Sequence, residues 1–361
     1  MGIIDPPRPE VAGAIRLASA AGIQVVMITG DAPETALAIA HQIGMETERA
    51  IHGRDLDAWA DSEVVQSLQQ GALFARTTPE QKLRIVTLLQ GLGHVVGMTG
   101  DGVNDAPALK KADIGIAMGV RGTEVARSAS GMVLLDDNFA SIIGAIHEGR
   151  RQYDNIQKFV RYLLSSNSAE VVAILFNIVL GGPLILLPVQ ILWMNLVTDG
   201  ATAVALGAEK ADRDTMRRPP RPPNERILNR SGLTTVALIG MYMGIATLWL
   251  FHHYLDGDPE NGAVMAQTAA FTGLIMLEKM NVFNFRSLRE PLSTIGPFSN
   301  PWILIAWTAT VGLQLAAVYV PFLQSVLHTT ALGLQDWGLI IMVAAPVLVA
   351  GEVYKYWQNR S

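Results

Sequence analysis

Two aspartates, Asp101 and Asp105, stand four residues apart among the glycines of Thr99–Pro107, which reads TGDGVNDAP. Carboxylates at this spacing on a tight glycine turn can share one hard cation. Mg²⁺ favours sites with few carboxylates, several waters and a phosphate oxygen. The glycines also let a phosphate approach the backbone closely. The stretch therefore predicts a magnesium site that handles a phosphoryl group.

Groups that could hold the phosphate itself occur at two other places. Thr29, Gly30 and Asp31 follow an apolar run, and Lys82 stands near the start of a predicted helix. A threonine hydroxyl, backbone N–H groups and a lysine ammonium can together bind a phosphate. A Thr-Gly-Asp sequence alone is usually only a turn, and a single helix lysine is usually a solvated charge. The complete set, at the ends of predicted strands, favours a phosphate site.

Apolar runs that end in polar residues predict the strands of an α/β domain. Ile23–Thr29 and His94–Thr99 are each followed by a Gly-Asp turn, which is typical of buried parallel strands. Strands alternating with helices predict a doubly wound sheet, whose ligands bind beyond the carboxyl ends of its strands. Further strands are predicted at Ile114–Met118 and Met132–Leu135, and helices at Pro33–Ile43 and Glu80–Leu89.

These motifs resemble those of the phosphorylation domain of P-type ATPases, which belongs to the haloacid-dehalogenase-like hydrolases. Thr99–Pro107 resembles the family's magnesium motif, and Ile28–Asp31 (ITGD) resembles its threonine motif. Phe74–Lys82 (FARTTPEQK) resembles its lysine motif. Ile4–Arg8 (IDPPR) resembles the hinge that leads back from the nucleotide domain.

The resemblance implies a role for each motif. Asp101 and Asp105 would bind Mg²⁺, with Asn104 and Asp105 supporting the site. Thr29 and Lys82 would contact the transferred phosphoryl group. The residues implied in catalysis are Thr29, Gly30, Asp31, Lys82, Asn104 and Asp105, and those implied in ATP binding are Asp5, Arg8, Thr29, Gly30, Asp31 and Lys82.

The resemblance also implies a missing residue. The family's nucleophile is the aspartate of an Asp-Lys-Thr-Gly-Thr motif, which does not occur here, and Asp5 is followed by Pro-Pro-Arg. We therefore expect the C-terminal part of a pump, without the phosphorylated aspartate, the nucleotide and actuator domains and the first four membrane helices. Such a chain would be inactive alone and would form no acid-stable phosphoenzyme with ATP.

The composition changes sharply along the chain. Hydrophobic residues make up 50% and charged residues only 16%, which points to a membrane protein. The net charge of −5 argues against nucleic-acid binding, and the absence of cysteine excludes disulfides and thiolate metal sites. We predict a soluble domain over residues 1–150 and an all-α transmembrane domain over 151–361. Six apolar segments of about the length that a bilayer requires are predicted as helices, at 159–180, 187–207, 233–254, 264–283, 302–321 and 336–357.

The distribution of basic residues predicts how these spans are oriented. The connections 181–186, 255–263 and 322–335 contain no Lys or Arg, whereas 208–232 contains seven and 284–301 contains two. Because basic loops stay in the cytoplasm, the C-terminus is predicted to be cytoplasmic. A continuous helix is predicted from Ile142 to Arg161, between the soluble domain and the first span.

Polar residues inside three spans could bind a cation. Ionisable residues within a membrane are costly and usually functional, although a single Asn or Thr more often only holds helices together. Oxygen donors without sulfur or imidazole suit a hard cation such as Ca²⁺. Gly200 would ease local unwinding and free backbone carbonyls as ligands. The candidate ligands are Asn167 and Glu170 in the first span, Asn195, Thr198 and Asp199 in the second, and Glu278 in the fourth.

These spans resemble helices five to ten of the calcium-pump class of P-type ATPases, and the same six residues match that class's Ca²⁺ ligands. The resemblance implies one complete Ca²⁺ site in this chain and a second that needs the absent fourth helix. The class usually has a proline where Thr202 stands, which bears on the expected unwinding. Lys279 lies about 100° around the helix from Glu278, so it need not share its face, and the sequence gives it no role.

The expected function is that of the C-terminal portion of an ATP-driven pump that exports Ca²⁺ from the cytoplasm. Its cofactors would be Mg²⁺ and ATP, and its partners the lipid bilayer and the N-terminal portion of the pump. A bacterial plasma membrane is the expected location. The alternatives are a pump for Mn²⁺ or for Na⁺ and K⁺, a non-catalytic cation-binding subunit or gene remnant, and a membrane-tethered phosphatase. The missing nucleophile argues against the phosphatase.

Overall fold

The structure is a computed structural model that describes residues 6–255 and 262–358. Asp5 and most of the predicted connection 255–263 lie outside the described residues. The chain divides into two compact units, one formed by Met1–Arg150 with Arg213–Glu225 and the other by Arg151–Asp212 with Arg226–Ser361. The first is called the α/β unit below, and the second the helical unit. The helix α8 (Phe139–Val179) contributes residues to both, and it contains the helix predicted over Ile142–Arg161.

The α/β unit alternates short strands with helices, as the apolar runs predict. Helix α5 shows how the sequence sets a boundary. Pro79 is its first residue, and Thr78 and Gln81 form a reciprocal capping box. Before α8 the elements are α1 (Pro9–Ala20), α2 (Pro33–Gln42), β1 (Ala50–His52), α3 (Gly53–Ala58), α4 (Asp61–Gln69), β2 (Leu73–Ala75), α5 (Pro79–Gly91), β3 (Gly97–Gly100), the 3₁₀ turn η1 (Val103–Asp105), α6 (Ala106–Lys111), β4 (Ile114–Met118), α7 (Glu124–Ala129) and β5 (Met132–Leu134).

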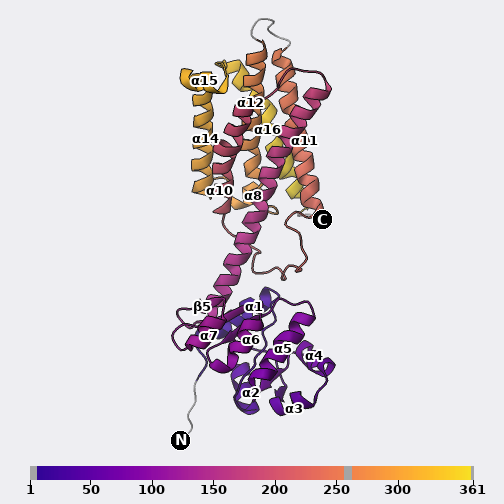
Figure 1. The fold of residues 1–361 in the computed structure, drawn as a ribbon, viewed down its shortest axis with the longest axis vertical. Helices are drawn as coiled ribbons and strands as arrows, with labels where there is room; N and C mark the ends of the chain where they lie inside the picture. The colour runs from indigo at the N-terminus through magenta and orange to yellow at the C-terminus, as the bar shows by residue number, and fades with distance from the viewer. Residues whose placement is uncertain (1–5, 256–261, 359–361) are drawn as a thin grey trace. The chain divides into compact units, whose positions relative to one another are not determined.

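All strand pairs described in this unit are parallel, but they form two sheets, β1–β2 and β3–β4–β5. The strand predicted at Ile114–Met118 is confirmed as β4. The strand predicted at Ile23–Thr29 is wrong, because this extended segment makes only one isolated bridge, from Ile28 to Phe74. It lies beside β2 and makes no ladder with β3, so the single doubly wound sheet that we expected is divided in two. Helices α5 and α6 lie side by side (Figure 1).

The helical unit is a bundle of long helices (Figure 1). Helix α14 begins as its sequence predicts, with Pro301 as the first residue and the Asn300 side chain accepting from the Trp302 and Ile303 amides. Besides α8, the elements are α9 (Pro188–Leu192), the π-helical segment η2 (Trp193–Asp199), α10 (Gly200–Gly207), α11 (Arg230–Leu255), α12 (Gly262–Asn284), α13 (Leu292–Ile295), α14 (Pro301–Tyr319), α15 (Pro321–Leu327) and α16 (Leu334–Gln358).

Five helical segments of the described residues are long and apolar enough to cross a bilayer, and this is the composition of a membrane protein. They correspond to five of the six predicted spans. The sixth prediction, 264–283, falls on α12, which has the length but is not among these five. Helix α12 carries Glu278 and Lys279, and nearly all of its residues from Thr268 to Asn284 are buried. It packs against α11, α14 and α16. A helix enclosed by other helices can carry charges that a lipid-facing helix could not.

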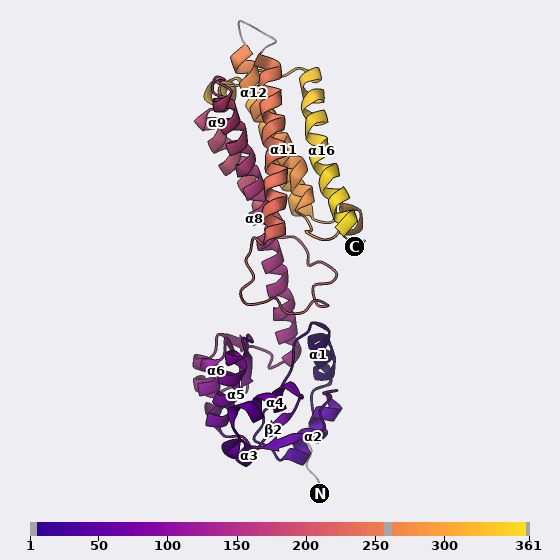
Figure 2. The same ribbon diagram turned by 90° about the vertical axis from the view of Figure 1, so that its right-hand side faces the viewer.

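Small residues let α11 approach α8 closely. Figure 2 shows α11 between α8 and α16. A Cβ built on Gly240 would lie 2.7 Å from the Ser168 Cβ, and one on Gly244 would lie 2.5 Å from a Val172 methyl group. Glycines four residues apart on a membrane helix are a known device for such close packing. This contact holds α8 against α11 on either side of Glu170 in the sequence, at Ser168 and Val172.

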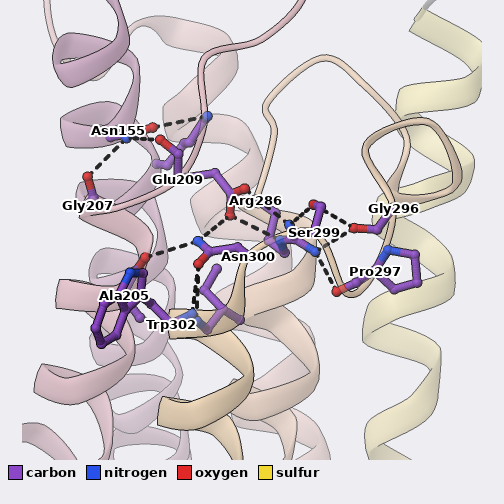
Figure 3. Close-up of polar contacts among 12 residues, drawn as sticks. Asn155, Ala205, Gly207, Glu209, Arg286, Gly296, Pro297, Ser299, Asn300 and Trp302 are labelled. Atoms are coloured by element: carbon purple, nitrogen blue, oxygen red, sulfur yellow. Dashed lines mark hydrogen bonds and ion pairs between the residues drawn. The ribbon is translucent and has the colours of Figure 1, made fainter. Parts of the chain in front are cut away.

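A buried ion pair joins the ends of three helices (Figure 3). The Arg286 guanidinium, 1% exposed, donates to both carboxylate oxygens of Glu209 at 3.1 Å. It also donates to the Gly296 and Pro297 carbonyls and to the Ser299 hydroxyl. The residues are 77 positions apart, so no periodic pattern in the sequence predicts the pair.

We expect Arg286→Met to lower the free energy of unfolding by about 3–5 kcal/mol, because it leaves the Glu209 carboxylate buried without its cation. Titration of the chain with SDS in mixed micelles measures this change. The double variant Arg286→Met/Glu209→Met removes both charges and should recover most of the loss. A single variant no less stable than the double variant would contradict the expectation.

Candidate functional site

The loop after β3 folds the Asp105 carboxylate back onto its own backbone. Asp105 Oδ2 accepts from the Asp101 amide at 3.3 Å and from the Gly102 amide at 3.2 Å. A Cβ on Gly100 would lie 2.5 Å from the Asp105 Cβ, so the strand must end in glycine for this turn to form. Asp105 is buried, whereas Asp101 and Asn104 are exposed.

Lys82 meets Asp105 across 23 residues of sequence. It lies in the first turn of α5, and its Nζ donates to Asp105 Oδ1 at 2.6 Å. Both oxygens of Asp105 are therefore engaged, one by the ammonium and the other by the two amides. This arrangement suits a residue that positions the loop, and it leaves the exposed Asp101 carboxylate as the better placed metal ligand.

The predicted threonine motif lies beside the segment that leads into α5. The Thr29 hydroxyl is 3.1 Å from the Asp31 carboxylate, and it accepts from the Asp31 amide at 3.1 Å. The Thr29 carbonyl accepts from the amide and the hydroxyl of Thr77, and the Asp31 carbonyl accepts from the Arg76 amide. Gly30 is exposed. The structure thus connects Thr29 and Asp31 to the start of the helix that carries Lys82.

Arg8, the last residue of the predicted hinge, contacts a different loop. The Arg8 guanidinium donates to the Asp136 carbonyl at 3.3 Å, in the loop that follows β5. In the described residues the structure gives Arg8 no bond to Thr29, Asp31 or Lys82. The predicted part of Arg8 in ATP binding therefore remains a prediction.

Asp137 holds a second loop of this site. It adopts φ of 51°, a conformation that aspartate tolerates, and its carboxylate accepts from the Val120 and Arg121 amides at 2.9 Å each. The same loop continues to Thr123, whose amide donates to the Asp101 carbonyl at 2.8 Å. The Val120 amide, assisted by the Arg121 amide, lowers the pKa of Asp137 below its usual value. Asp137 therefore supports the loop that neighbours Asp101.

We expect Asp137→Asn to speed hydrogen exchange of the amides in residues 119–123 several-fold at pH 7. A carboxylate whose pKa is lowered by folding stabilises the fold above its unfolded pKa, and that stabilisation is lost as the pH falls through the folded pKa. The difference between wild type and variant should therefore shrink below about pH 4. Hydrogen-exchange mass spectrometry at matched pH measures both. An equal effect from Asp55→Asn, at an exposed position, would show that the loop does not depend on Asp137.

A second group of polar residues is buried in the helical unit. Glu170 on α8 is 7% exposed, and the Asn195 side-chain amide donates to both of its carboxylate oxygens at 3.1 and 3.2 Å. Glu278 on α12 is fully buried and interacts electrostatically with Asp199, Lys279 and Glu170. The structure therefore brings the three predicted carboxylates into one buried neighbourhood.

Several carboxylate oxygens of this neighbourhood have no hydrogen-bond partner in the described part of the chain. They are Asp199 Oδ2 and both oxygens of Glu278. Buried carboxylate oxygens without donors are expensive, which points to a ligand that supplies positive charge. Over residues 6–255 and 262–358, no three His, Asp or Glu side chains lie close enough to chelate one ion without other donors. A bound cation would therefore draw the carboxylates together or add hydroxyl, amide and carbonyl ligands.

The helix that carries Asp199 is continuous, which corrects the expected unwinding at Gly200. Asp199 and Gly200 both have helical backbone angles. The irregularity lies just before them, because Trp193–Asp199 is π-helical. π-Helical turns are wider than α-helical turns and are frequent at functional sites. Near the end of this segment the Thr198 carbonyl accepts from Lys279 Nζ at 3.0 Å and from the Thr202 hydroxyl at 2.8 Å.

Two predicted ligands lie on outer surfaces of the unit. Asn167 is exposed and, within the described residues, makes no hydrogen bond to the other candidates. Asn195 is also exposed, although its amide reaches Glu170. Thr198 is fully buried, and its hydroxyl donates to the Met194 carbonyl at 2.9 Å.

Three residues of this neighbourhood were not predicted. The Tyr162 hydroxyl donates to Asp199 Oδ1 at 2.8 Å, and Lys279 Nζ approaches the same oxygen at 3.2 Å. Lys279 also reaches the Thr202 hydroxyl at 2.9 Å. An ionisable residue inside a span was the signal that could have identified Lys279. For Tyr162 and Thr202 the sequence offers no comparable signal.

Comparison with known proteins identifies relatives for both parts of the chain. Residues 183–357 match the C-terminus of cation transporting ATPases, and residues 1–113 match the haloacid dehalogenase-like hydrolases. A calcium-transporting ATPase of Bacillus subtilis is 46% identical over 356 residues, covering 98% of this chain and 40% of that protein. An endoplasmic reticulum calcium ATPase of Aspergillus fumigatus is 42% identical, covering 100% and 41%. An endoplasmic reticulum-type calcium-transporting ATPase of Arabidopsis thaliana is 39% identical, covering 99% and 39%.

Proposed function

We propose that this chain is the C-terminal portion of a Ca²⁺-transporting P-type ATPase, because residues 183–357 match the C-terminus of cation transporting ATPases and residues 1–113 match the haloacid dehalogenase-like hydrolases. The chain spans about 40% of the length of the curated relatives it matches. The complete pump would export Ca²⁺ from the cytoplasm and draw energy from ATP.

The observation that carries the proposal is the set of buried carboxylates in the helical unit. Asp199 and Glu278 are fully buried, Glu170 is nearly so, and three of their oxygens lack a donor among the described residues. Such oxygens suit a hard divalent cation. The exposed amides of Asn167 and Asn195 would add oxygen ligands to that ion, and only a second site would need helices of the N-terminal portion. Mn²⁺ has similar ligand preferences and is the second candidate ion.

The α/β unit would supply the phosphoryl-transfer part of the cycle. Asp101 would hold Mg²⁺, and the bound ion would offset the charge of the transferred phosphoryl group. Lys82 is fixed by Asp105, which in turn orders the loop that carries Asp101. Thr29 lies on the segment beside the start of α5, where it could donate to a phosphoryl oxygen. The aspartate that accepts the phosphoryl group would come from the N-terminal portion.

The basic residues of the loops support an orientation of the chain in the membrane. The basic connections 208–232 and 284–301 would face the cytoplasm, together with the C-terminus and the phosphoryl-transfer site. The partners would be the lipid bilayer and the N-terminal portion, as part of the same polypeptide or as a separate subunit. We infer a bacterial plasma membrane as the location, in line with the relative from Bacillus subtilis.

Ca²⁺-stimulated ATP hydrolysis by the complete pump in proteoliposomes, measured with Ca²⁺ uptake, tests this function. We expect activity at micromolar Ca²⁺ in wild type and its loss in Glu170→Gln, which keeps the shape of the side chain and removes its charge. Stimulation by Mn²⁺ with none by Ca²⁺ would favour the second candidate. Hydrolysis that neither ion stimulates would overturn the proposal.

A further inference from the structure

Lys279 places a fixed positive charge against the buried carboxylate of Asp199. Both side chains have no solvent exposure, and Lys279 Nζ lies 3.2 Å from Asp199 Oδ1. The ammonium also contacts the Tyr162 hydroxyl at 3.2 Å, the Thr198 carbonyl at 3.0 Å and the Thr202 hydroxyl at 2.9 Å. Four oxygen atoms thus surround Lys279 Nζ in much the way that oxygen ligands surround a cation.

These contacts divide the oxygens of Asp199 between two partners. Oδ1 is engaged by Lys279 and by the Tyr162 hydroxyl, which itself contacts the ammonium. No donor group in the described part of the chain reaches Oδ2 or either oxygen of Glu278. The Glu278 carboxyl instead interacts with the carboxyl of Asp199. One side of Asp199 is therefore held by a built-in cation, and the other side remains available to an ion.

The charges of the neighbourhood suggest how many ions it holds. Glu170, Asp199 and Glu278 carry three negative charges when ionised, and Lys279 reduces the total to two. One divalent cation neutralises two charges, whereas two divalent cations would leave an excess of positive charge in a buried site. Repulsion between the ammonium and a bound cation is strong where water is excluded.

We propose that Lys279 is a resident cation of the ion-binding neighbourhood, one that sets its affinity for Ca²⁺ and limits the helices of this chain to one divalent ion. The proposal rests on the proposed function, because it requires that the neighbourhood bind Ca²⁺. Lys279 acts by holding Asp199 Oδ1 and by repelling a second cation. It is a specificity-determining residue and makes no bond to the transported ion.

Equilibrium binding of ⁴⁵Ca²⁺ to the 361-residue chain in lipid nanodiscs tests the proposal. In Lys279→Met, which keeps the length of the side chain and removes its charge, we expect the Kd for Ca²⁺ to fall about tenfold or more. Lys279→Arg keeps the charge and should bind with the wild-type Kd to within about threefold. Lys355→Met is the matched control, since Lys355 is a buried lysine paired with Glu352 at 3.0 Å on another helix, and its Kd should not change.

Thermal unfolding of each variant separates the role of the charge from loss of structure. Lys279→Met leaves Asp199 without its ammonium and should unfold at a lower temperature than wild type in the absence of Ca²⁺. If Lys279 had only a structural role, replacing it with Met would lower the stability and leave the Ca²⁺ affinity unchanged or weaker. Tighter Ca²⁺ binding by a less stable variant is the combination that supports the proposal.

The outcomes that overturn the proposal are distinct from those that overturn the proposed function. Wild type that binds Ca²⁺ while Lys279→Met binds no more tightly refutes the role of Lys279 alone. An equal gain in Ca²⁺ affinity in Lys355→Met also refutes it, because any lost positive charge would then strengthen Ca²⁺ binding. Folded wild type, Lys279→Met and Lys279→Arg that all fail to bind Ca²⁺ refute the ion site itself, and the role of Lys279 with it.

Discussion

Asp199→Asn should abolish Ca²⁺-dependent ATP hydrolysis by the complete pump and weaken Ca²⁺ binding about 100-fold or more. The variant removes one of three buried carboxylates, and with it the Oδ2 atom that no donor among the described residues reaches. It also leaves Lys279 as a buried ammonium without its carboxylate, so the free energy of unfolding should fall by about 3–5 kcal/mol. ATP hydrolysis and Ca²⁺ binding over a range of Ca²⁺ concentrations, together with SDS titration, measure these effects.

Two further variants separate loss of the ion from loss of stability. Asp199→Asn/Lys279→Met removes both charges and should recover stability without recovering Ca²⁺-dependent hydrolysis. Asp212→Asn is a matched control, because Asp212 is a buried carboxylate whose oxygen lies 3.6 Å from Lys158 Nζ, away from the predicted ligands. It should retain the Ca²⁺ affinity of wild type. Recovery of hydrolysis in the double variant would show that Asp199 serves the fold and not the ion.

Asp101→Asn should slow formation of the phosphoenzyme by the complete pump about 100-fold or more, since it removes the exposed carboxylate assigned to Mg²⁺. The loop should keep its conformation, because the Asp101 contacts that hold it are made by backbone atoms. The Asp101 amide donates to Asp105, and its carbonyl accepts from Thr123. Rapid-quench measurement of ³²P incorporation from ATP, at several Mg²⁺ concentrations, gives the rate and its dependence on the metal.

Asp113→Asn is a control for Asp101→Asn, because it changes an aspartate beside the same strand. The Asp113 carboxylate accepts from the Val96 amide at 2.7 Å, just before the start of β3, whereas Asp101 follows the other end of that strand. Ligands of parallel sheets bind beyond the carboxyl ends of strands, so Asp113→Asn should leave the rate of phosphorylation nearly unchanged. Equal losses in the two variants would place the effect in the stability of the sheet and not in the metal site.

The sequence predicted the α/β unit in part. The run Ile114–Met118 was predicted at its observed bounds because it is short and apolar, and in the structure it is the central strand of its sheet. The run Ile23–Thr29 has the same appearance but pairs with the rest of the unit at only one bridge. Apolar content reports that a segment is buried, and it does not report whether a neighbouring backbone lies in register. The strands β1 and β2, each three residues long, were too short to give a periodic signal.

In the helical unit, the positions of the spans could be predicted and their internal contacts could not. Spans follow from runs of apolar residues. The contact of Lys279 with Asp199 joins residues 80 positions apart and depends on how α12 turns within the bundle. The π-helical segment likewise has no sequence rule that would reveal it, and Thr202 in place of a proline fits a helix that stays continuous there. The candidate ligands Glu170, Asp199 and Glu278 were predicted because buried charge in an apolar span is conspicuous.

The most direct measurement of the central claim is the density of the bound ion in a cryo-EM structure of the complete pump, compared with one prepared in EGTA. We predict one ion within about 2.3–2.6 Å of oxygens from Asp199, Glu278 and Glu170, with the ammonium of Lys279 still at Asp199 Oδ1. That density should be absent in EGTA. A Ca²⁺ ion bound elsewhere, with these three carboxylates unliganded, would contradict the account.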